Sequence, residues 1–137
     1  MSTQYVILAV IALMFFGWKA YAAGYIGPNP PGTQHIDVNQ AKDIIENGVD
    51  VQILDVRTPR EWNSGVVQNS ILINLYDREF EQKVSQLSKD KPVVIICRSG
   101  NRSNSAMRAM ADMGFTDLYN VRGGINSWNR AGYEIKR

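Results

Sequence analysis

The sequence predicts an α/β fold in which helices cover both faces of a mostly parallel sheet. From residue 34 onward, short apolar runs alternate with segments whose apolar residues recur at helical spacing. One run, Val93 to Ile96, is continuously β-branched, which is typical of a strand buried on both faces. Strands that alternate with helices at this pitch usually pair in parallel through right-handed crossovers.

Several local signals place the individual elements. Asp37 or Asn39 can cap a first helix, and Gly48 can end it. Thr58 resembles an N-cap, because Pro59 follows it and a glutamate three residues on completes a capping box. The expected strands are 35–36, 51–56, 70–74, 93–96 and 116–121, and the later helices are 77–87, 103–113 and 125–131.

The composition fits a single globular domain. The chain has 137 residues, of which 45% are hydrophobic and 20% charged, and its net charge is +2. Lysines and arginines are spread along the chain, so we expect no nucleic-acid partner and a monomeric soluble domain. The one cysteine excludes an internal disulfide, and the one histidine, His35, has no evident partner ligands for a metal.

The amino-terminal residues 1–26 are hydrophobic and differ in kind from the rest. The apolar run Tyr5 to Trp18 would extend about 21 Å as a helix, which is shorter than a hydrocarbon core of about 30 Å. With Lys19 at an interface, the run as far as Ile26 would reach about 33 Å and could span a membrane.

Besides a core helix of the folded domain, which the lack of a polar face disfavours, two interpretations of residues 1–26 remain open. An uncleaved membrane anchor is favoured, because Met1 to Gln4 carries no lysine or arginine and Lys19 is unusual beside a cleavage site. The alternative is a signal segment, cleaved near Ala22 during export to the periplasm. We therefore expect a chain held at the membrane by one amino-terminal helix, a Pro/Gly linker at 27–33 and a folded domain at 34–137.

Polar residues follow two of the predicted strands. Asp55, Arg57 and Arg60 come after the second strand, and Cys97 follows the fourth. Because ligands of such sheets bind outside the carboxyl ends of the strands, both groups should lie at the same functional edge. We expect Asp55 to hold the loop by accepting hydrogen bonds or pairing with an arginine, rather than to transfer protons.

Cys97 is the candidate nucleophile. A lone cysteine is usually a small buried hydrophobe, but this one ends a buried strand and precedes a loop that opens a helix. Backbone N–H groups and a positive helix end there favour a thiolate and hold an anion. No histidine is near in sequence, so a Cys–His pair has little support. The residues expected to bind the anionic substrate are Arg98, Ser99, Gly100, Asn101, Arg102 and Ser103.

Three motifs together resemble the rhodanese-type sulfurtransferases. Cys97-Arg-Ser-Gly-Asn-Arg102-Ser103 resembles their active-site loop, and Asp55-Val-Arg-Thr-Pro-Arg-Glu61-Trp62 resembles their upstream signature. Asn120-Val-Arg-Gly-Gly-Ile-Asn-Ser-Trp128 resembles their closing segment. The resemblance covers nearly all of residues 34–137, and it implies a rhodanese-like, five-stranded, mostly parallel sheet with helices on both faces.

The resemblance also implies a reaction. Phosphatases of this fold have five residues between cysteine and arginine, whereas the sulfurtransferases have four, as between Cys97 and Arg102. It therefore implies transfer of a sulfane sulfur from thiosulfate or a similar anionic donor, through a Cys97 persulfide, to a thiol or cyanide acceptor, without cofactor or metal. The alternatives are a persulfide carrier that does not turn over, a membrane-tethered interaction module, and a phosphatase or arsenate reductase.

Overall fold

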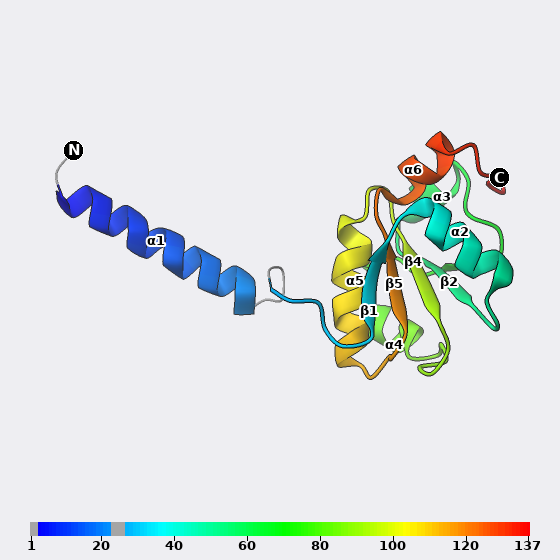
Figure 1. Ribbon diagram of the computed structural model, residues 1–137, viewed down its shortest axis with the longest axis horizontal. Coiled ribbons are helices and arrows are strands. Elements are labelled where there is room, and N and C mark those ends of the chain that lie inside the picture. The colour runs from blue at the N-terminus through cyan, green and yellow to red at the C-terminus, as the bar shows by residue number, and fades with distance from the viewer. Residues whose placement is uncertain (1–2, 23–26) are drawn as a thin grey trace.

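The computed structural model describes residues 3–22 and 27–137, and its folded part is built on one parallel sheet (Figure 1). The strand order is β1-β5-β4-β2-β3, and every pairing between neighbours is parallel. The predicted α/β fold is thus confirmed, with a wholly parallel sheet where a mostly parallel one was expected. The strands are β1 Thr33–Ile36, β2 Gln52–Asp55, β3 Ile71–Leu72, β4 Val93–Ile96 and β5 Leu118–Val121.

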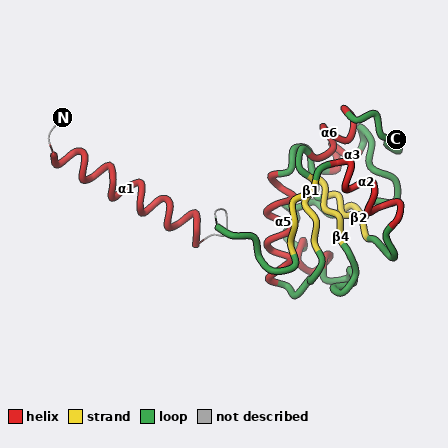
Figure 2. Tube along the Cα trace, viewed as in Figure 1, coloured by secondary structure: helices red, strands yellow, loops and turns green. Residues whose placement is uncertain are grey.

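Helices pack on both faces of the sheet, as Figure 2 shows in red against the yellow strands. The core on one face contains side chains of α4 and α5, and the core on the other contains side chains of α2 and α6. A short helix, α3, directly follows the loop after β2. The helices are α2 Val38–Asn47, α3 Pro59–Trp62, α4 Phe80–Val84, α5 Asn101–Asp112 and α6 Gly124–Arg130.

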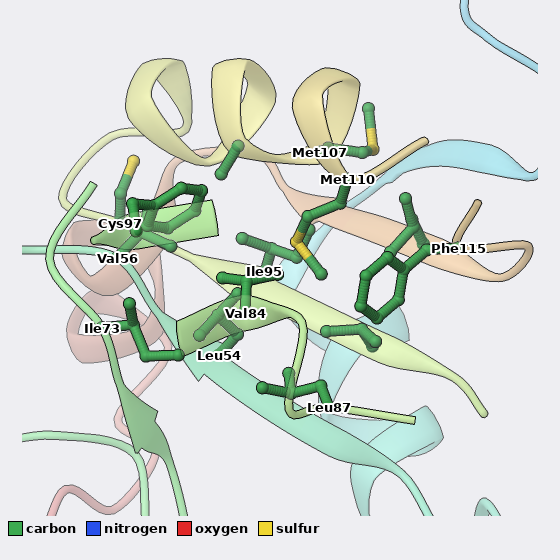
Figure 3. Packing of buried hydrophobic residues seen from close by; sticks show 14 residues of the cluster. Leu54, Val56, Ile73, Val84, Leu87, Ile95, Cys97, Met107, Met110 and Phe115 are labelled. Atoms are coloured by element: carbon green, nitrogen blue, oxygen red, sulfur yellow. The ribbon is translucent and has the colours of Figure 1, made fainter. Parts of the chain in front are cut away.

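Strand β4 shows how the sheet divides the interior into two cores. Val93 and Ile95 pack in the cluster with α4 and α5, whereas Val94 and Ile96 pack in the cluster with α2 and α6. This alternation follows from the two-residue period of a strand. Cys97 continues the first set, at the α5 face of the sheet, and only 1% of its surface is exposed (Figure 3).

The capping signals are confirmed. Asp37, rather than Asn39, caps α2, and its side chain and that of Gln40 form a capping box. Thr58 caps α3 in the same way, with Pro59 in the first turn.

Two predicted elements are shorter than expected. The helix predicted over 77–87 is limited to α4, because turns flank it: the Phe80 N–H bonds to the Asp77 carbonyl, and the Leu87 N–H bonds to the Val84 carbonyl three residues back. The strand predicted over 70–74 is limited to β3, which pairs only with Leu54 and Asp55 at the sheet edge. The helix predicted over 103–113 instead begins at residue 101.

The amino-terminal segment forms the helix α1, Thr3–Ala22. Its large apolar side chains, for example Leu13 and Phe16, are exposed. Within residues 3–22 and 27–137, no helix is long and apolar enough to cross a membrane, so the predicted membrane-spanning anchor is not supported. Residues 23–26 of that anchor lie outside the described residues, and the location of the chain stays a prediction. The linker predicted over 27–33 ends one residue early, since Thr33 already belongs to β1.

Two leucines on neighbouring strands provide a test of this core. Leu54 of β2 is fully buried, whereas Leu72 of β3 is 41% exposed. Leu54→Ala should lower the free energy of unfolding by about 2 to 5 kcal/mol, because it removes buried methyl groups and leaves a cavity. Leu72→Ala, the same change at the surface, should cost less than about 0.5 kcal/mol. Urea unfolding measures both, and equal losses would contradict the described core.

Candidate active site

Cys97 lies at the carboxyl end of β4, where the chain turns into α5. The turn passes through Gly100, whose φ of +103° favours glycine and which forms the N-cap of α5. The Gly100 N–H donates to the Cys97 Sγ at 3.1 Å, and the Ser103 hydroxyl lies 3.2 Å from the same sulfur. Cys97 and Ser103 are both buried, so the sulfur lies beside polar groups at the end of an apolar strand.

The amino-terminal end of α6 holds the loop after Cys97. The Ile125 N–H donates to the Cys97 carbonyl at 2.8 Å, and the Asn126 N–H donates to the Arg98 carbonyl at 3.2 Å. In a trans peptide the C=O and the following N–H point in opposite directions. The N–H groups of Arg98 and Ser99 therefore point away from α6, where they are available to an anion.

Gly124 permits this close approach. A Cβ atom at this position would lie 2.3 Å from the Cys97 carbonyl oxygen and 2.7 Å from that of Arg98. Its φ of +51° also lies in the left-handed region. A side chain at residue 124 would therefore push the loop and α6 apart.

Asp55 and Arg57 form a buried ion pair behind the loop. The Arg57 Nη2 donates to the Asp55 Oδ2 at 2.7 Å, and Nε lies 3.0 Å from both carboxylate oxygens. The Arg57 backbone N–H and Trp62 Nε1 also donate to Asp55, at 3.0 and 3.2 Å, and Arg57 Nη2 reaches the Gly65 carbonyl at 2.7 Å. Asp55 thus pairs with an arginine and accepts hydrogen bonds, and together these contacts tie the end of β2 to α3 and the turn that follows it.

Arg102 and Glu61 join α5 to α3 through a second, two-pronged ion pair. The Arg102 Nη1 and Nη2 atoms donate to the two Glu61 carboxylate oxygens at 2.8 and 2.6 Å. These hydrogen bonds, with smaller contributions from Thr58, lower the pKa of Glu61 to about 2. The hydrogen bonds to Glu61 in turn raise the pKa of Arg102. Part of the positive charge at Arg102 is therefore already balanced by a carboxylate.

The other predicted residues lie on the surface around the sulfur. Arg98, Ser99 and Asn101 are exposed, and Arg98 shares a small pocket with Arg57 and Glu61. Arg60 is exposed on α3 and takes no part in the contacts around Cys97 described above. Within residues 3–22 and 27–137, no three His, Cys, Asp or Glu side chains gather as a metal site would require.

Asn120 is a site residue to which the sequence prediction assigned no role. Its Oδ1 lies 2.5 Å from the Ser103 hydroxyl, and its Nδ2 donates to the Gly100 carbonyl at 3.2 Å. Nδ2 is also 2.9 Å from the His35 Nδ1. The only signal in the sequence was an asparagine between Tyr119 and Val121 of the last strand. The structure shows that this asparagine is buried, with 3% of its surface exposed. Nothing in the spacing along the chain connects residue 120 with residue 35.

Gly124→Ala tests whether α6 positions the loop. Gly132→Ala is a matched control, because Gly132 also has a positive φ of +75°, but a Cβ added there would have nothing within 4 Å. Gly132→Ala should cost about 1 to 2 kcal/mol of stability through backbone strain, and Gly124→Ala should cost more, because its Cβ also collides with backbone carbonyls. Only Gly124→Ala should slow alkylation of Cys97 by iodoacetamide at neutral pH, by about 10-fold, through displacement of the Gly100 donor. Equal alkylation rates in the two variants would contradict the positioning role.

Known proteins resemble this chain in sequence and in fold. The family model for the rhodanese-like domain matches residues 37–131. A thiosulfate sulfurtransferase GlpE of Shewanella oneidensis is 31% identical over 98 residues, which cover 72% of this chain and 94% of that protein. A sulfurtransferase of Allochromatium vinosum is 33% identical over 100 residues, which cover 73% of this chain and 92% of that protein.

Solved structures agree with these relatives. A rhodanese-related protein from Thermoplasma volcanium has a TM-score of 0.64 and 36% identity, over 75% of this chain and 97% of that one. A rhodanese-like domain protein from Staphylococcus aureus has a TM-score of 0.65 and 30% identity, over 76% and 99%. With these matches and a buried cysteine at the end of β4, the chain belongs to the rhodanese-like domain family and is homologous to sulfurtransferases.

Proposed function

We propose that this chain transfers a sulfane sulfur from thiosulfate, or a similar anionic donor, to a thiol through a persulfide on Cys97. One observation carries the proposal: the Cys97 sulfur accepts a hydrogen bond from the Gly100 N–H. The N–H groups between them, those of Arg98 and Ser99, point away from α6. Such an array stabilises an anion on the sulfur. The names of the two sulfurtransferase relatives support the same reaction.

The first step loads the cysteine. The Cys97 thiolate attacks the outer sulfur of thiosulfate, a new S–S bond forms, and the bond between the two thiosulfate sulfurs breaks. Sulfite leaves with the electron pair of that bond, and Cys97 keeps a persulfide whose terminal sulfur is negative. The loop N–H groups then face a charge that lies one atom farther out than in the thiolate.

The second step unloads it. A thiolate acceptor attacks the terminal sulfur, the Cys97–sulfur bond breaks, and the electron pair of that bond returns to Cys97 as a thiolate. Cyanide can take the same sulfur in an assay and leave as thiocyanate. This division into two half-reactions is a ping-pong scheme with a covalent intermediate.

A pocket beside the loop gives the acceptor room. It is lined by Leu75, Tyr76 and Arg102, together with neighbouring polar residues of α5, and holds about 590 Å³. Tyr76 is 69% exposed, so the pocket presents an aromatic ring next to a guanidinium group. A small organic thiol fits this mixture of apolar and charged surface.

Intact mass measurement tests the proposal. Incubation of the full chain with thiosulfate should add the mass of one sulfur atom, and Cys97→Ser should add none. Addition of cyanide should then remove the sulfur and release thiocyanate. Loading without turnover by any thiol would instead indicate a persulfide carrier. No loading by several sulfane donors, together with hydrolysis of an aryl phosphate, would reject sulfur transfer in favour of phosphatase chemistry.

Arg102→Ala tests the predicted role of this arginine toward the anionic donor. Loss of one charge-assisted contact should lower kcat/KM for thiosulfate by the equivalent of about 1 to 3 kcal/mol. Arg102→Lys should retain part of the activity, because it keeps the positive charge and loses only the planar guanidinium that can donate two parallel hydrogen bonds. Arg130→Ala, which removes an exposed arginine at the end of α6, is the matched control for net charge. Unchanged kinetics in Arg102→Ala would remove Arg102 from the donor site.

A further inference from the structure

A chain of side chains connects the Cys97 sulfur with His35, the only histidine of the protein. His35 lies on β1 directly opposite Asn120 of β5 in the strand register. The chain runs from His35 Nδ1 to Asn120 Nδ2 at 2.9 Å, from Asn120 Oδ1 to Ser103 Oγ at 2.5 Å, and from Ser103 Oγ to Cys97 Sγ at 3.2 Å. We propose that His35 and Asn120 are positioning residues, which act through Ser103 and determine whether its hydroxyl bonds to the Cys97 sulfur.

The Ser103 hydroxyl has two acceptors and one hydrogen. It can donate to the Asn120 Oδ1 or to the Cys97 Sγ, but not to both at once. When the hydrogen lies toward Asn120, the remaining contact requires the Cys97 thiol to donate to the Ser103 oxygen. This first arrangement therefore suits the protonated thiol.

The rest of the chain is satisfied in that first arrangement only if His35 is neutral. The two hydrogens on Asn120 Nδ2 then bond to the Gly100 carbonyl and to a bare His35 Nδ1. The His35 hydrogen sits on Nε2, which lies 3.1 Å from the Asn29 Oδ1. Each of these donors thus has an acceptor.

A thiolate at Cys97 calls for the opposite arrangement. If the Ser103 hydroxyl turns to the sulfur, no hydrogen remains between the Ser103 and Asn120 oxygens, and they repel each other at 2.5 Å. A half-turn of the Asn120 amide restores a donor there. Its Oδ1 then faces the Gly100 carbonyl, which loses its donor, and the His35 Nδ1, so this arrangement is favoured only when a hydrogen on that nitrogen offsets the loss.

Protonation of His35 supplies that hydrogen and keeps the one on Nε2, whereas the neutral Nδ1–H tautomer would leave a bare Nε2 against the Asn29 Oδ1. The thiolate and the His35 imidazolium therefore favour each other, although their side chains are separated by two residues. Because such coupling is reciprocal, each ionisation shifts the other by the same factor.

The surroundings of His35 set the pH range in which this coupling appears. Burial, then Arg122, then Arg108 of α5 lower the pKa of His35. Arg122 also donates to the His35 carbonyl, and Arg102 of α5 lies close enough to Cys97 to interact with it electrostatically. These effects favour neutral His35, and the imidazolium that the second arrangement needs forms only as the pH falls. A polar pocket of about 220 Å³, lined in part by His35, Asn120 and Arg122, faces solvent beside the loop.

The alkylation rate of Cys97 with iodoacetamide tests the inference in the full chain, between pH 5 and pH 9. The inference rests on the proposed function only in that Cys97 is the nucleophile, and the assay uses no sulfur donor. Below the titration midpoint of His35, the parent protein should react at least about 2-fold faster than His35→Gln, as expected for coupling within one network. In the Ser103→Ala background, His35→Gln should have no effect.

Two results would overturn the inference. An equal effect of His35→Gln with and without the Ser103 hydroxyl would mean that the His35 charge acts through space, and no effect in either background would mean that the two groups are not coupled. An NMR pH titration of His35, the one histidine, is a second measurement. Cys97→Ala should lower the titration midpoint of His35 only when Ser103 is present. Failure of thiosulfate to load Cys97 would leave both readings intact, and failure of these readings would leave sulfur loading intact.

Discussion

The site depends on two backbone hydrogen bonds, donated by Ile125 and Asn126 to the carbonyls of Cys97 and Arg98. They orient the loop peptides, and they connect the loop to the core that Ile125 and Trp128 form on the other face of the sheet. The lack of a single Cβ, at Gly124, makes this contact possible. The conformation of the loop is therefore a product of helix packing, and it is held by the sheet and α6.

The charged side chains near the loop serve mainly to hold it together. Arg57 pairs with Asp55, and much of the Arg102 charge is balanced by Glu61, so the strongest electrostatic interactions link α3 to β2 and to α5. Direct contacts to the sulfur come instead from the Gly100 N–H and from the Ser103 hydroxyl. Under the proposed function, peptide groups fixed by α6 would need little reorganisation when the sulfur is loaded.

Local sequence signals predicted the fold well, because β-branched runs, capping boxes and glycine stops act over a few residues. They also placed Cys97 and the Asp55–Arg57 cluster at the correct sheet edge, since parallel strands share a direction. Local signals could not predict the pairing of Arg102 with Glu61, because 41 residues separate the two partners along the chain. The same holds for His35 and Asn120, which meet only because β1 lies beside β5 rather than beside β2. Non-consecutive strand order brings together residues that no motif connects.

Cys97 belongs to the hydrophobic core as well as to the site, since it packs in the cluster that contains Val56, Phe80 and Met107. A sulfur atom added to it must therefore be accommodated at the boundary of close-packed side chains, where volume changes are felt. The added sulfur atom would therefore change the free energy of unfolding of the domain. If the proposed persulfide forms, loaded and empty molecules should unfold at different temperatures, and a melting curve would report the fraction of loaded protein.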